Sequence, residues 1–213
     1  MTMWTPMKKR ANSEPAARTS TLRRGLLASG LWLGLGGPAL ARRYEGYDFP
    51  DKLQLGGASL QLNGVGKRAV AIIKGYLAAL YLGKSASTPE QAYATPGPKR
   101  IQIYMLLDVG AEEFVKAVNK GVQRNCSEAE KAALSEAQPA FIAQLRAVNK
   151  VYKKDLIDMD YLPERGTLLS INGKPAGNAI PGPELYQALL KVFLGERPVD
   201  KRLKSGLLGG SPD

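Results

Sequence analysis

The chain has 213 residues, with 30 Lys or Arg against 19 Asp or Glu, no His and one Cys. Without histidine, Ser-His-Asp and Cys-His catalysis and His-ligated zinc or iron are excluded, and a single cysteine excludes thiolate metal clusters and an internal disulfide. No dinucleotide-binding or P-loop glycine pattern occurs, so we expect no metal and no other cofactor.

The first 41 residues have the layout of a cleavable secretory signal. All six of their basic residues precede the uncharged residues 25–41, which end in Ala39-Leu40-Ala41, a small-x-small cleavage pattern. A membrane span needs about 20 strongly apolar residues, whereas this stretch is shorter and contains five Gly and one Pro. We therefore predict cleavage after residue 41 rather than a retained anchor, and no stable membrane span afterwards.

Export would leave a mature domain of residues 42–213. The pair Arg23-Arg24 resembles a twin-arginine signal, and we predict a periplasmic or secreted protein. Removing the signal leaves 24 basic and 18 acidic residues, a net charge of +6 instead of +11. The basic residues are scattered rather than clustered with aromatic ones, so we expect no nucleic-acid partner. A chain of this length suits one domain with a sizeable core.

Alternating runs and glycine turns predict strands at the start of this domain. Residues 52–55 and 59–62 alternate polar and apolar side chains across a Gly-Gly pair, which predicts a β-hairpin, and the Asn-Gly pair at 63–64 predicts a second turn. The apolar residues 68–82 predict two strands with a bulge or break at Gly75.

The next segments predict a short helix and another strand. Thr88 followed by Pro89 is typical of a helix start. Residues 100–106 alternate as a half-buried strand does, with Gln102 and Tyr104 on the face opposite the apolar side chains.

Helical periodicity follows, beginning near residue 111 with an apolar stripe of Phe114, Val115, Val118 and Val122. Residues 127–130 form a capping box that predicts a second helix, and Pro139 predicts a kink or break within it.

The last third returns to strands and ends in helices. In residues 157–162, Asp158 and Asp160 share one strand face, where we expect a solvated edge rather than a pair of working carboxylates. The Asn-Gly pair at 172–173 predicts a hairpin, residues 183–194 a helix, and Asp200 the cap of a final short helix. Strands, helices, strands and helices in this order predict an α+β fold, with helices covering one face of an antiparallel sheet.

In order and spacing, these residues resemble the chalcone isomerase-like family, in its bacterial exported branch. The resemblance covers nearly all of residues 44–208. It implies an open-faced β-sandwich, a large antiparallel sheet with a layer of helices against it. The matching segments are Leu60-Gln61-Leu62-Asn63-Gly64-Val65-Gly66-Lys67-Arg68, Ala79-Leu80-Tyr81-Leu82, Asp108-Val109, Ile171-Asn172-Gly173-Lys174, Phe193-Leu194-Gly195 and Pro198-Val199.

The plant enzyme of this family cyclises chalcones by intramolecular attack of a phenolate, without metal, cofactor or histidine, and uses an arginine together with Thr, Tyr and Asn side chains. By resemblance, Arg68 matches the arginine. The polar positions hold Tyr76, Phe114, Gly121 and Val192. Each lost donor of such a site costs about 3 kcal/mol of transition-state stabilisation, so the resemblance weighs against this activity.

We therefore expect a non-catalytic domain that binds a small amphipathic anion, such as a fatty acid, in a cleft lined by Arg68, Tyr76, Tyr104 and Phe114. Arg68 is interpreted as an anion anchor or as a surface arginine, and the tyrosines as ligand contacts or core residues. Two other functions stay open, an intramolecular lyase or isomerase acting on an unsaturated carbonyl compound and an envelope interaction protein without a small ligand. The sequence indicates no oligomeric state.

Overall fold

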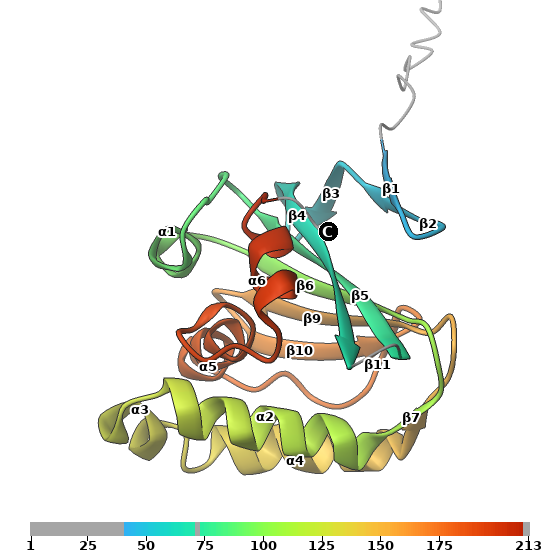
Figure 1. The fold of residues 1–213 in the computed structure, drawn as a ribbon. Coiled ribbons are helices and arrows are strands. Elements are labelled where there is room, and N and C mark those ends of the chain that lie inside the picture. Colours follow the sequence, from blue (N-terminus) through green and yellow to red (C-terminus); the bar gives the residue numbers. More distant parts are fainter. Residues whose placement is uncertain (1–40, 71–72, 211–213) are drawn as a thin grey trace, which may run out of the picture. The chain divides into compact units, whose positions relative to one another are not determined.

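An antiparallel sheet of seven strands organises the structure, in the order β11-β10-β9-β6-β5-β4-β3 (Figure 1). The computed structural model describes residues 41–70 and 73–210; the predicted signal, apart from Ala41, lies outside them. The strands of this sheet are β3 (Lys52–Leu55), β4 (Ala58–Val70), β5 (Ile73–Leu82), β6 (Lys99–Met105), β9 (Leu156–Leu162), β10 (Gly166–Ile171) and β11 (Lys174–Pro175).

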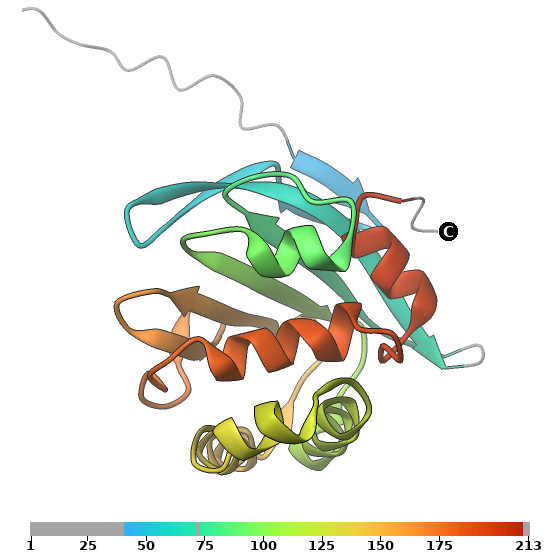
Figure 2. The ribbon, with the colours of Figure 1, turned by 90° about the vertical axis from the view of Figure 1, so that its left-hand side faces the viewer.

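Helices pack against one face of this sheet, with α5 and α6 over the strands and α2 beside α4 (Figures 1 and 2). Among the described residues, no helix is long and apolar enough to cross a membrane. The helices are α1 (Pro89–Ala94), α2 (Ala111–Asn125), α3 (Glu128–Ala133), α4 (Ala137–Val148), α5 (Glu184–Leu194) and α6 (Lys201–Leu207). The α+β prediction, including the helical layer on an antiparallel sheet, is confirmed.

Two short strand pairs complete the fold. One pair joins β7 (Val109–Gly110), before α2, to β8 (Lys150–Val151), after α4. The other joins β1 (Ala41–Tyr44) to β2 (Tyr47–Pro50). Side chains of this second pair pack on the sheet face opposite the helices, where Tyr47 stacks on Tyr104 with ring centres 4.1 Å apart and Phe49 is fully buried.

Strand alternation divides the buried residues into two clusters. In β5, Tyr76, Ala78 and Leu80 belong to the large core under the helices, whereas Leu77 and Ala79 belong to the smaller cluster under β2. Because successive side chains of a strand point to opposite faces, one buried strand contributes to both clusters.

The helix starts follow the predicted caps. The Thr88 hydroxyl accepts a bond from the backbone N–H of Gln91, and the Ser127 hydroxyl accepts one from the backbone N–H of Glu130. The Glu130 carboxylate in turn accepts a bond from the Ser127 N–H, which completes the capping box. Asp200 caps α6. The predicted interruption lies between α3 and α4, just before Pro139, which occupies the first turn of α4, where a proline is tolerated.

The first hairpin is confirmed, since β3 pairs with β4 across Gly56 and Gly57. The turn predicted at residues 63–64 is wrong, because both residues lie inside β4. The Asn63 side chain instead accepts from the Ala86 N–H at 2.7 Å and donates to the Leu207 carbonyl at 2.7 Å. The bulge predicted at Gly75 is confirmed. Arg68 pairs with Tyr76 and Ala69 with Lys74, so the register shift leaves Gly75 of β5 without an opposing residue on β4.

Gly64 allows α6 to lie directly on β4. A Cβ atom at Gly64 would stand 2.1 Å from the Gly206 carbonyl oxygen, and one at Gly206 would stand 2.3 Å from the Val65 carbonyl oxygen. Glycine is required where two backbones come this close. The Asn-Gly pair therefore marks a helix-docking position rather than a turn.

The expected solvated edge at Asp158 and Asp160 is also wrong. Their strand, β9, is an interior strand between β6 and β10, and both carboxylates are buried. Arg100 on β6 donates two bonds of 2.6 Å to Asp160 and lies 3.3 Å from Asp158. Gln102 donates to Asp158 at 2.8 Å. Both carboxylates are therefore held by charged or polar side chains of the neighbouring strand, as buried charges require.

Candidate ligand cavity

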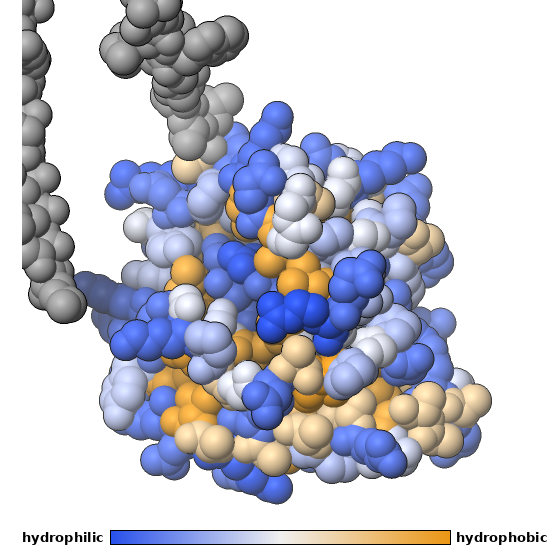
Figure 3. Space-filling view, turned by 180° about the vertical axis from the view of Figure 1, so that it is seen from behind, coloured by the Kyte–Doolittle hydropathy of each residue, from blue (hydrophilic) through white to orange (hydrophobic). Residues whose placement is uncertain are grey.

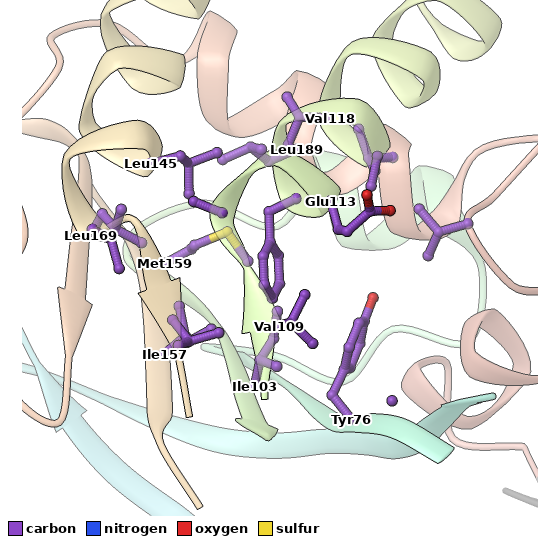
Figure 4. Close-up of a pocket in the computed structure, with 18 of the residues that line it drawn as sticks. Tyr76, Ile103, Val109, Glu113, Val118, Leu145, Ile157, Met159, Leu169 and Leu189 are labelled. Atoms are coloured by element: carbon purple, nitrogen blue, oxygen red, sulfur yellow. The ribbon is translucent and has the colours of Figure 1, made fainter. Parts of the chain in front are cut away.

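An apolar cavity lies between the sheet and the helical layer (Figure 4). Its volume is about 90 Å³, several times the roughly 10–15 Å³ that one water needs. The apolar lining comes from sheet and helices alike and includes Ile103, Ile157, Met159, Leu169, Val118, Leu145 and Leu189. Such a lining favours hydrocarbon over ordered water.

Arg68 and Tyr76 line this cavity together at the β4–β5 end of the sheet. They are directly paired residues of adjacent strands, and the Arg68 guanidinium lies 5.8 Å from the centre of the Tyr76 ring, within cation–π range. Arg68 is half-buried, and its Nε atom is buried without a hydrogen-bond partner. Among the described residues, no carboxylate is within ion-pairing distance of Arg68.

The absence of a partner at Nε is energetically unusual. A buried donor left unpaired costs about 1–3 kcal/mol, and more when it is charged. A guanidinium is suited to grip a carboxylate or phosphate through two parallel N–H···O bonds. Arg68 is therefore placed to receive an anion at the rim of an apolar cavity.

Tyr76 on β5 contributes a hydroxyl group to the sheet side of the cavity. Its side chain rises from the sheet with the hydroxyl toward the side where the Glu113 carboxylate lies (Figure 4). Burial raises the pKa of this hydroxyl far above its ordinary value, and the Arg68 charge offsets only part of the rise. Tyr76 is therefore a neutral hydrogen-bonding group near pH 7.

Glu113 and Phe114 come from the first turns of α2. Phe114 is half-buried and lines the cavity. Glu113 is more exposed, and its carboxylate accepts a bond from Lys116 at 2.7 Å. Sequence reasoning missed Glu113, although the helical stripe containing Phe114 places it at the edge of the buried face.

The structure does not bring Tyr104 to this cavity. Its β6 neighbours Ile103 and Met105 face the helices, so Tyr104 points to the other face, where it stacks on Tyr47. Because Tyr104 alternates with Ile103 and Met105 along β6, the sequence alone already places it on the other face. Grouping Tyr104 with Arg68 and Tyr76 was therefore wrong as a matter of geometry.

The positions matched to the enzyme's asparagine and late threonine contact each other. A Cβ atom at Gly121 on α2 would stand 2.7 Å from the Val192 side chain on α5, so the two helices meet closely here. Val192 also lines the cavity. Apolar packing thus occupies the place where those side-chain donors would be expected.

The surface away from the cavity is mixed in character. Hydrophobic residues reach the surface across the middle of the face seen from behind, with hydrophilic residues among and around them (Figure 3). Among residues 41–69 and 75–210, whose side chains the structure describes, Tyr152 is the one large hydrophobic residue that is mostly exposed, at 55%. Within the same ranges, no group of three or more His, Cys, Asp or Glu side chains is arranged to hold a metal ion.

Fold and cavity together define an open-faced β-sandwich with an apolar pocket under its helical layer. The chain belongs to the chalcone isomerase-like family, whose model matches residues 41–209. Among solved structures, it is similar to a fatty-acid binding protein of Arabidopsis thaliana, with 15% identity and a TM-score of 0.58 over 79% of this chain and 95% of that chain. At this identity the likeness concerns the fold. No curated protein matches the sequence.

Proposed function

We propose that this protein is an exported, non-catalytic carrier of a small amphipathic anion such as a fatty acid. The acyl chain would occupy the apolar cavity, and the carboxylate would lie between Arg68 and Tyr76. The observation that carries the proposal is the buried, unpartnered Nε of Arg68 at the rim of a cavity whose other walls are almost wholly apolar.

Three further points support binding rather than catalysis. The positions matched to the family's Tyr, Asn and Thr hold Phe114, Gly121 and Val192, which offer no side-chain donor. An open cavity is what a carrier needs, whereas an interaction protein without ligand needs only a filled core. The similar Arabidopsis protein is named for fatty-acid binding.

The test is titration of delipidated protein with palmitate, read by calorimetry and native mass spectrometry. Arg68→Met should weaken binding by about 10- to 100-fold, the loss of a charge-assisted, partly buried contact of roughly 1.5–3 kcal/mol. Lys67→Met is the matched control, because Lys67 immediately precedes Arg68 in β4, points to the opposite face and pairs with Glu45 at 2.7 Å.

Palmitate binding that is equal in wild type and Arg68→Met would overturn the proposal, and so would a failure of wild type to bind any single-chain amphipathic anion. A second arm supplies a chalcone to both proteins. Cyclisation by wild type that is lost in Arg68→Met would establish the intramolecular lyase instead, because the arginine would then be stabilising the developing negative charge.

A further inference from the structure

A second depression adjoins the apolar cavity and is strongly basic. It shares Arg68, Ala117 and Val199 with the cavity, so the two spaces meet at Arg68. Lys120 and Arg124 reach it from α2, and Arg197 reaches it from the segment between α5 and α6. Its volume is about 110 Å³.

The cations of this depression are not neutralised by the protein. Within the described parts of the chain, none of Arg68, Lys120, Arg124 and Arg197 forms an ion pair with a carboxylate. The contrast lies in the same helix, where Lys116 pairs with Glu113. No acidic residue is among the described residues that line the depression.

Four cations exceed what a single carboxylate can use. One guanidinium already binds both oxygens of a carboxylate in a two-bond fork, so Arg68 alone can hold a fatty-acid head group. The other three charges repel one another, and only a head group with several anionic oxygens engages them together. A phosphate monoester has three such oxygens and close to two negative charges near neutral pH.

We propose that the ligand is a single-chain lipid with a phosphate head group, its chain in the apolar cavity and its phosphate in the depression formed by Arg68, Lys120, Arg124 and Arg197. This inference rests on the proposed function, because it requires the cavity to hold an acyl chain. It goes further by assigning the head group to phosphate rather than carboxylate.

The experiment compares four probes on the delipidated protein at 0.15 M salt: palmitate, 1-palmitoylglycerol 3-phosphate, 1-palmitoylglycerol and glycerol 3-phosphate. We expect the phosphate lipid to bind at least about tenfold more tightly than palmitate, because three additional surface-exposed charges contribute modestly each. Its affinity should also fall more steeply with added salt, since exposed charges are screened.

The decisive variant combines Lys120→Gln, Arg124→Gln and Arg197→Gln and retains Arg68. In this variant, the affinities for palmitate and for 1-palmitoylglycerol 3-phosphate should differ by no more than about threefold. Palmitate should still bind, which also shows that the variant is folded. The matched control removes three charges elsewhere, by Lys52→Gln, Lys84→Gln and Arg165→Gln, at residues that line neither space. This control should retain the full preference.

The outcomes separate the two proposals. Palmitate binding without a preference for the phosphate lipid, or a preference that survives in the triple variant, overturns the phosphate assignment alone. Glycerol 3-phosphate binding as tightly as the lipid would reduce the depression to a phosphate site unrelated to the cavity and would also overturn it. If neither palmitate nor the phosphate lipid binds, the carrier function itself fails.

Discussion

At the scale of single residues, Arg68 and Arg100 show two uses of a guanidinium in one sheet. Arg68 has no partner at Nε and borders a cavity, whereas Arg100 is held by the carboxylates of Asp158 and Asp160 on the opposite face. Removing a partner from a buried charge is expensive. Replacing Arg68 should therefore lower the affinity for ligand, whereas replacing Arg100 should lower the free energy of unfolding.

Arg100→Met should lower the free energy of unfolding by about 3–5 kcal/mol at pH 7, because it leaves buried carboxylates without their cation. Arg43→Met is the control, since Arg43 forms an exposed 4.0 Å contact with Asp48, where the cost should be about 0–1 kcal/mol. Urea unfolding of the three proteins measures both values. Equal losses in the two variants would contradict the structural role of the buried cluster.

The pH dependence of Arg100→Met follows from Asp158. Burial raises the pKa of this carboxyl, and the Arg100 charge is the strongest influence that lowers it. Without Arg100 the pKa rises further, so the folded state holds a proton that the unfolded chain releases. Stability of the variant should therefore increase as the pH falls from 7 toward 5. A loss of stability over this range, relative to wild type, would contradict this account.

The sequence identified part of the candidate site at this scale. Arg68, Tyr76 and Phe114 meet at one cavity, because each was placed from a local match within its own strand or helix. Glu113 and the basic residues around Lys120 were not identified, since their neighbourhood depends on how α2 packs on the sheet. The burial of Asp158 was missed for the same reason, because alternation shows a strand's faces but not its neighbours.

At the scale of elements, local chemistry determined most of the helix starts. Capping residues such as Ser127 and Asp200 bond backbone N–H groups only two or three residues further along the chain, so the sequence pattern alone predicts them. The docking of α6 on β4 is different, because it joins residues about 140 positions apart. Gly64 was therefore mistaken for a turn glycine, although its lack of a side chain serves the contact with Gly206.

Gly206→Ala should destabilise the protein by about 1–3 kcal/mol, since its methyl group would overlap the β4 backbone and force α6 away. Gly83→Ala is the matched control, because a Cβ there meets nothing closer than 3.9 Å and the backbone is not left-handed. It should change stability by less than about 0.5 kcal/mol. Thermal or urea unfolding measures the change in the free energy of unfolding. Similar changes in the two variants would rule out a tight β4–α6 contact.

At the scale of the whole molecule, the sequence predicted the fold class and the helical layer, because periodicity and the order of elements carry that information. It did not predict that a short strand pair covers the other sheet face. The apolar run at residues 68–82 predicted strands but not what covers each face, and only the packing of Phe49 and Tyr47 shows how the second face of β5 is buried.

The proposed export has its own test at this scale. Expressed as the full chain in a bacterial host with both export routes, the protein should be recovered from the periplasm or medium with Arg42 as its first residue, as shown by mass spectrometry of the intact protein. Replacing Arg23 and Arg24 with Lys should reduce recovery if the twin-arginine route is used. Cytoplasmic protein with an intact N-terminus would contradict the signal.

The position of β9 beside β6 has a consequence for how the chain folds. These central strands are separated by roughly 50 residues that contain three helices, so their pairing must wait for the closure of a long loop. Neighbouring hairpins such as β4–β5 need no such closure. Folding should therefore proceed through early hairpins and a late, rate-limiting closure of the sheet centre on the millisecond-to-second scale typical of non-local topologies. Until that closure, the inner edges of β6 and β9 remain unpaired, and a chaperone that binds exposed strand edges has a defined interval in which to act.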